Sequence, residues 1–123
     1  MKATLYHLQI NVSNAKASLP FYKDLFSYFN YKIIDESKAH LSASNGTTDF
    51  WIMQTEKKFS DKIFHRKSTG LNHIAFRLDS KAKVDNFVGN FLKKRKIVPL
   101  YKSPKHFPKY TKGYYAVFFE DPD

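Results

Sequence analysis

The sequence predicts an α+β domain built from two copies of a βαβββ module. Two observations support this: an internal similarity at a spacing of 66 residues, and, in each copy, an alternating apolar stretch followed by apolar residues at helical spacing. The equivalent pairs are His7 and His73, Leu8 and Ile74, Ile10 and Phe76, Val12 and Leu78, Phe21 and Phe87, Leu25 and Phe91, and Phe26 and Leu92. We expect one domain over residues 1–123, with module one at about 1–56, a linker at about 57–70 and module two at about 71–123.

The first module begins with a strand at residues 7–12, where apolar and polar residues alternate. Ser13 or Asn14 can cap the helix that follows, and its apolar stripe comprises Phe21, Tyr22, Leu25, Phe26 and Phe29. Pro20 lacks a backbone donor, so we expect it to kink this helix or delay its start. Short strands are expected at 32–34, 40–43 and 49–54, with a hairpin turn at Asn45-Gly46.

The second module repeats the order with a strand at residues 73–78. Asp79 or Ser80 can cap a helix over 81–94, whose apolar stripe comprises Val84, Phe87, Val88, Phe91 and Leu92. Strands are expected at 97–101 and 114–119. Because Pro104, Pro108 and Gly113 interrupt the intervening sequence, we expect a loop over 102–112.

The composition limits the function classes. The chain has no cysteine, which excludes a thiolate metal site or a cysteine nucleophile, and no apolar stretch long enough to span a bilayer. The net charge of +10 is compatible with nucleic acid, an anionic membrane surface or a small acidic molecule as partner. Its densest cluster, Lys93–Lys96, lies at an expected helix end, where cations complement the helix dipole. We expect a cytoplasmic protein with a small-molecule, anionic substrate and no nucleic acid or membrane partner.

Two histidines occupy equivalent positions in the two modules. If the apolar residues of each first strand pack on the helices, the opposite face carries His7, Gln9 and Asn11 in one copy and His73, Ala75 and Arg77 in the other. Imidazoles are common ligands of divalent metals, and two of them with one carboxylate leave positions open for a bidentate substrate. A solvated strand residue is the other interpretation of each histidine taken alone. We interpret His40, His65 and His106 as surface residues.

Three segments resemble the vicinal-oxygen-chelate superfamily of glyoxalases, bleomycin resistance proteins and extradiol dioxygenases: HLQINVSNAKASLPFYKDLF, GLNHIAFRLDS and YYAVFFEDPD. The resemblance implies a cupped mixed sheet around a divalent metal (Fe, Mn, Zn or Ni), with His7 and His73 at the two histidine ligand positions. The carboxylate of the glyoxalase pattern falls near Ile52 and is missing. The family's last ligand follows an Asp-Pro-Asp-Gly turn, so we expect that ligand and the last strand to lie beyond Asp123, in a longer protein. Glu120 is the nearest carboxylate, and we expect it to have a structural role.

The sequence is compatible with two functions. One is a metal-dependent lyase or extradiol-type dioxygenase that chelates vicinal oxygens of its substrate. The other is a metal-free binding or resistance protein, with Phe50, Trp51, Tyr114 and Tyr115 lining an aromatic cleft. The expected substrate-binding residues are Arg77, Asn11, Trp51 and Tyr115. We also expect a homodimer, because superfamily domains often pair their modules across a dimer interface.

Overall fold

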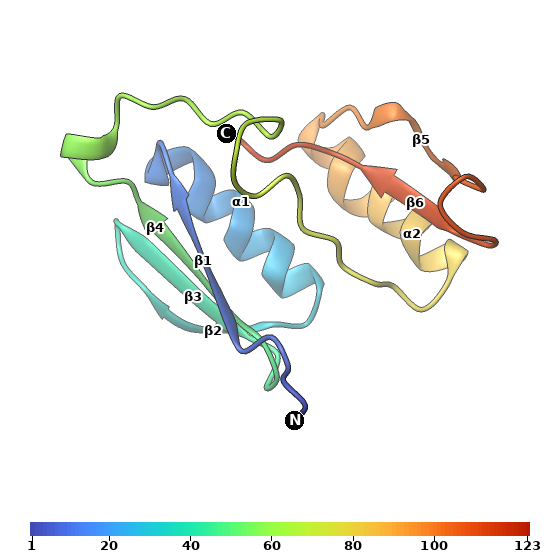
Figure 1. Cartoon of the computed structure of the whole chain (residues 1–123), viewed down its shortest axis with the longest axis horizontal. Helices are drawn as coiled ribbons and strands as arrows, with labels where there is room; N and C mark the ends of the chain where they lie inside the picture. Colours follow the sequence, from blue (N-terminus) through green and yellow to red (C-terminus); the bar gives the residue numbers. More distant parts are fainter. The chain divides into compact units, whose positions relative to one another are not determined.

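The computed structural model describes all residues from 1 to 123 and has the predicted α+β composition, with two α-helices and two sheets. Its elements are β1 (His7–Val12), α1 (Ala15–Tyr28), β2 (Lys32–Glu36), β3 (His40–Ser44), β4 (Asp49–Gln54), η1 (Lys57–Phe59), α2 (Lys81–Phe87), η2 (Val88–Leu92), η3 (Lys93–Arg95), β5 (Leu100–His106) and β6 (Tyr115–Phe118) (Figure 1). The chain forms two compact units. The first unit comprises Met1–His65 with Asp121–Asp123, and the second unit comprises Arg66–Glu120.

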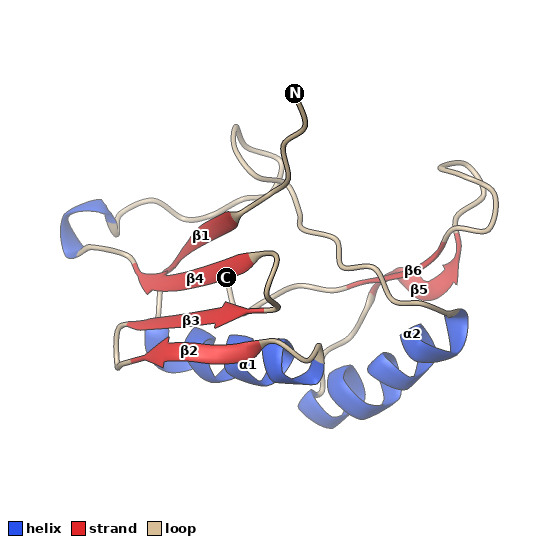
Figure 2. Ribbon diagram, turned by 90° about the horizontal axis from the view of Figure 1, so that it is seen from below, coloured by secondary structure: helices blue, strands red, loops and turns tan.

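The first unit is a complete βαβββ module. Its four strands lie in the order β1-β4-β3-β2, with β1 parallel to β4 and the other neighbours antiparallel (Figure 2). The hairpin between β3 and β4 turns at Asn45-Gly46, as predicted, and Gly46 has a φ of 88° that a side chain would disfavour. The register pairs Gln9 with Trp51 and Trp51 with Ser42, which fixes the residues that share each face.

Helix α1 lies on one face of this sheet (Figure 2). The buried apolar residues of the first unit are Val12, Ala15, Leu19, Tyr22, Leu25, Phe26, Leu41, Ala43, Phe50 and Ile52. Phe26 of α1 and Phe50 of β4 place their ring centroids 4.9 Å apart at the centre of this core. The buried strand residues of this set alternate with residues whose side chains point to the opposite face, and α1 is the only α-helix of the first unit.

Pro20 does not delay the start of α1, which begins at Ala15. The expectation of a late start was wrong because the first turn has its own partners. The Asn14 side chain accepts a hydrogen bond from the Lys16 amide (3.1 Å), and Gln54 Oε1 accepts one from the Ala15 amide (2.7 Å). Pro20 itself lies on the exposed side of the helix.

The second unit contains the expected helix but fewer strands than its repeat implies. Helical structure runs from 81 to 95 as α2, η2 and η3 in succession, with Ser80 as the N-cap, and ends at Lys96 in the left-handed region. The strand expected at 73–78 is not formed, although Ile74, Phe76 and Leu78 are half-buried and their neighbours exposed. In the first unit the equivalent strand β1 pairs only with β4. The second unit has only the antiparallel pair β5–β6, and neither of these strands forms a ladder with residues 73–78.

The loop expected over 102–112 begins later than predicted, because β5 extends to His106. The hydroxyl of Ser103 bridges the irregular stretch of this strand: it donates to the Leu100 carbonyl (2.6 Å) and accepts from the Phe118 amide (3.0 Å). Pro104 lies within the same irregular stretch, where its missing donor interrupts no regular ladder.

Candidate functional site

The face of the first sheet opposite α1 is the candidate site, and we call it the open face. It is formed by alternate residues of three neighbouring strands: His7, Gln9 and Asn11 of β1, Asp49, Trp51 and Met53 of β4, and His40, Ser42 and Ser44 of β3. The register sets them in three rows, of which the central one is Gln9, Trp51 and Ser42. Apart from Trp51 and Met53, every side chain in the set is polar, so the open face combines hydrogen-bonding groups with one large ring.

Trp51 lies at the centre of the open face and is 38% exposed. The imidazole of His40 lies beside it, with ring centroids 6.3 Å apart and planes tilted by 33°. The two rings together offer an aromatic surface on which a planar molecule can stack.

His40 is held in place by two neighbours. Its Nε2 lies 2.8 Å from Asp35 Oδ2, and its Nδ1 lies 2.8 Å from the hydroxyl of Ser37. The hydrogen bond from His40 lowers the pKa of the Asp35 carboxyl below its usual range. This anchoring fixes the plane of the imidazole, so the aromatic surface next to Trp51 is preorganised.

Three further polar groups lie on the open face, two exposed carboxamides and one buried hydroxyl. On β1, Gln9 Nε2 donates to Asn11 Oδ1 at 3.1 Å, which aligns the two exposed carboxamides along the strand. On β3, the Ser42 side chain is buried and its hydroxyl has no hydrogen-bond partner. An unpaired buried hydroxyl costs free energy, so a bound molecule or water that reached Ser42 would recover that cost.

Three of the six residues predicted for the site share the open face. His7, Asn11 and Trp51 come from the neighbouring strands β1 and β4, and all three are exposed. The other three belong to the second unit. His73 and Arg77 lie on the exposed side of residues 73–78, with His73 Nδ1 2.8 Å from Asn72 Oδ1.

Tyr115 is engaged with helix α2. Its hydroxyl donates to Asp85 Oδ1 at 2.5 Å, and the ammonium group of Lys81 lies 5.0 Å from its ring centroid. The hydrogen bond to Asp85 raises the pKa of Tyr115. Both partners come from α2, so this tyrosine lies on the helix side of the hairpin.

The prediction that Phe50 and Trp51 line one aromatic cleft is wrong. Phe50 and Trp51 are consecutive residues of β4 and point to opposite faces of the sheet. Phe50 is buried against Phe26, whereas Trp51 lies on the open face. Ile52, expected where a carboxylate ligand would stand, is fully buried on the helix side, while Asp49 is the carboxylate of β4 on the open face, in register with His7.

His7 and His73 belong to different units, so the metal ligation implied by the resemblance stays a prediction. Within either unit, no group of three His, Asp or Glu side chains comes together in a way that could hold an ion. His7 has an aromatic neighbour, Tyr6, whose ring centroid lies 5.5 Å from its own. Neither unit alone therefore provides the donor set that the resemblance implies.

Sequence reasoning missed the contribution of β3 to the site. His40 was interpreted as a surface residue, yet it is half-buried and packs beside Trp51. The pattern His40, Ser42, Ser44 is polar at a period of two, and this signal could have placed β3 on the same face.

No helix of the chain has the length and apolar character needed to cross a bilayer.

Comparison with known proteins gives consistent results over nearly the whole chain. Residues 4–123 match the Glyoxalase/Bleomycin resistance protein/Dioxygenase superfamily. The uncharacterised protein YqjT of Bacillus subtilis is 32% identical over 119 residues, which cover 97% of this chain and 91% of that protein.

Solved structures agree with this match. The crystal structure of a candidate glyoxalase from Bacillus halodurans has a TM-score of 0.88 and 36% identity, and the similarity covers 98% of this chain and 90% of that one. Lactoylglutathione lyase from Agrobacterium tumefaciens shares the fold, with a TM-score of 0.62 and 16% identity over 98% of this chain and 87% of that one. The chain therefore belongs to the Glyoxalase/Bleomycin resistance protein/Dioxygenase superfamily.

Proposed function

We propose that the chain is a small-molecule-binding member of this superfamily and that the open face of the first unit is its binding surface. The single observation that carries the proposal is the combination, on one sheet face, of the exposed Trp51 ring with ordered polar groups around it. Binding sites for small molecules typically pair an apolar or aromatic surface with a few placed polar groups.

The chemistry of the open face indicates the class of ligand. Gln9 and Asn11 offer amide N–H donors, and His7 offers a third polar group on the same strand. Trp51 and His40 offer a flat aromatic surface. A small planar molecule with neighbouring oxygen atoms satisfies both, because its oxygens accept from β1 while its plane stacks on β4.

A metal-dependent reaction is the second candidate, and the equivalence of His7 and His73 in the repeat favours it. In that case both imidazoles would be ligands of a divalent ion. Because neither unit alone gathers a donor set, we derive no catalytic step from such an ion.

Trp51 makes the proposal directly testable, because it is the only tryptophan of the chain and its fluorescence reports from the open face. We expect saturable, one-to-one fluorescence changes when the chelator-treated protein is titrated with catechols, α-keto acids or α-hydroxy ketones. Asn11→Ala should weaken the binding of the responding compound about tenfold, the effect of losing about 1.4 kcal/mol of binding free energy. The matched control is Asn86→Ala, on an exposed position of α2.

Two outcomes would contradict the proposal. Binding that Asn11→Ala leaves unchanged would place the ligand away from the open face. Binding that occurs only after loading with Fe²⁺, Mn²⁺, Zn²⁺ or Ni²⁺, and that His7→Ala abolishes together with metal retention, would establish the metal-dependent alternative.

A further inference from the structure

The net positive charge of the protein lies in one of its two units. The second unit carries 13 Lys and Arg against three Asp and Glu, whereas the first unit carries eight of each. The net charge of +10 therefore belongs to the second unit alone. Such an asymmetry indicates a surface that meets an anionic partner.

Within the second unit, the hairpin between β5 and β6 combines positive charge with aromatic rings. Residues 101–119 include four lysines and no acidic residue: Lys102, Lys105, Lys109 and Lys112. Neither Lys105 nor Lys109 takes part in an ion pair. Their positive charge is therefore not offset within the hairpin.

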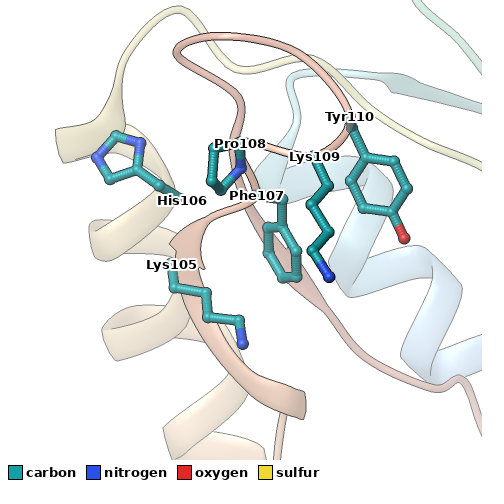
Figure 3. A pocket seen from close by; sticks show the side chains of 6 residues that line it. All are labelled: Lys105, His106, Phe107, Pro108, Lys109 and Tyr110. Atoms are coloured by element: carbon teal, nitrogen blue, oxygen red, sulfur yellow. The ribbon is translucent and has the colours of Figure 1, made fainter.

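A hollow of about 370 Å³ lies at this hairpin, lined by Lys105, His106, Phe107, Pro108, Lys109 and Tyr110. In Figure 3 the side chains of Lys105 and Lys109 extend on either side of the Phe107 ring, with Tyr110 beyond Lys109, while His106 points away to the other side. The ammonium group of Lys105 lies 5.2 Å from the Phe107 ring centroid. Two cations and an aromatic surface thus occupy one small hollow.

The hairpin is ordered by its own packing. Phe107 contacts three other aromatic residues. Its ring centroid lies 5.2 Å from that of Phe118, 6.0 Å from that of Tyr110 and 6.3 Å from that of Tyr114. The Phe107 amide donates to the Tyr114 carbonyl at 2.8 Å, and the Tyr110 amide donates to the Phe107 carbonyl at 3.1 Å. The lysines therefore project from a supported loop, which lowers the entropic cost of placing them around a ligand.

We propose that this hairpin is a binding site for a small ligand in which a phosphate dianion is attached to a planar aromatic ring. Two unpaired ammonium groups match the charge of a dianion, and the half-buried ring of Phe107 and the exposed ring of Tyr110 provide the surface for stacking. The volume corresponds to one small molecule. A single-stranded nucleic acid would need an extended track of charge and rings, so the observations favour the small ligand. The site is independent of the proposed function, which rests on the first unit.

The full chain tests this site by calorimetric titration with a nucleoside monophosphate, phenyl phosphate, the uncharged nucleoside and inorganic phosphate. We expect at least one of the two phosphorylated aromatics to bind one-to-one and more tightly than either the nucleoside or inorganic phosphate. Comparing the nucleotide with phenyl phosphate distinguishes the two sources of such a ligand. The double variant Lys105→Gln/Lys109→Gln should weaken binding by about tenfold or more.

The matched control is Lys57→Gln/Lys62→Gln, which removes two exposed charges from the first unit and should leave the affinity within about twofold. Phe107→Leu keeps an apolar side chain at this position and should weaken only the aromatic ligands, with the unfolding midpoint of each variant as the check on folding. Equal effects of the two lysine pairs, equal binding of inorganic phosphate, or no binding by either phosphorylated aromatic would each overturn the proposal. Tighter binding of a single-stranded oligonucleotide with a steep salt dependence would overturn it in favour of a nucleic acid.

Discussion

Tyr22 is a buried tyrosine whose hydroxyl donates to a carboxylate. It lies on α1, is 8% exposed, and its partner is Asp121 near the end of the chain. Burial raises the pKa of Tyr22 far above its ordinary value, and the negative charge of Asp121 raises it further. The native chain therefore retains this proton at pH values where the unfolded chain loses it.

The sign of the resulting pH dependence follows from proton binding. Above about pH 10 the native state binds more protons than the unfolded state, so Tyr22 makes the free energy of unfolding fall as pH rises. Tyr22→Phe should lower stability by about 1 kcal/mol at neutral pH and reduce the fall between about pH 9 and pH 11. Urea unfolding at neutral pH and at about pH 9 and pH 11 measures both effects. An unchanged slope in the variant would show that Tyr22 does not titrate differently in the two states.

Asp35 provides a second test at the level of single residues. Its carboxyl accepts from His40, and this hydrogen bond lowers its pKa. In His40→Gln we expect the Asp35 pKa to return toward its ordinary value, which a carboxyl-carbon NMR titration measures directly. Asp79 of the second unit, whose hydrogen bond with Lys83 lowers its pKa, serves as the reference carboxyl, and its pKa should be the same in both proteins. No change at Asp35 would contradict the anchoring of His40.

The N-terminus of α1 depends on a residue from a different element. Gln54 at the end of β4 accepts from the Ala15 amide at 2.7 Å and donates from Nε2 to the Ser13 carbonyl at 2.9 Å. Gln54→Ala should therefore destabilise the chain by about 1–2 kcal/mol, the usual effect of losing a cap. Gln9→Ala is the matched control on the exposed open face and should cost less than about 0.5 kcal/mol. Chemical denaturation compares the two, and equal losses would show that Gln54 has no capping role.

The elements that the sequence predicts correctly are those with a local signal. Alternation placed His7 and Asn11 on the face opposite the helix, and Asn45-Gly46 located the hairpin. The cap by Gln54 is not visible in the sequence, because it depends on β4 lying parallel to β1 and next to the start of α1. Residues 73–78 are a second example. Their burial alternates as predicted, but they form no strand, because a ladder requires a partner strand that the local pattern does not reveal.

The sequence predicted only the part of the candidate site that has a local signal. Alternation and resemblance selected His7, Asn11 and Trp51, which do share the open face. Alternation within each strand cannot show which strands are neighbours, so the contribution of His40 and Ser42 from β3 depended on the strand order. The pairing of Phe50 with Trp51 failed for a local reason: consecutive residues of a strand cannot face one surface.

At the scale of the whole molecule, the unequal distribution of charge predicts how stability responds to salt. The second unit carries a net +10 and the first unit is neutral, so like-charge repulsion acts mainly within the second unit. Salt shortens the range of this repulsion, to about 10 Å at about 0.1 M ionic strength.

Lys112→Glu, in the second unit, should raise the thermal unfolding midpoint at low salt. Lys62→Glu, an equally exposed change in the neutral first unit, should not. The difference between the two variants should shrink as salt is added, and a stabilisation by Lys112→Glu that persists at high salt would contradict repulsion as its cause.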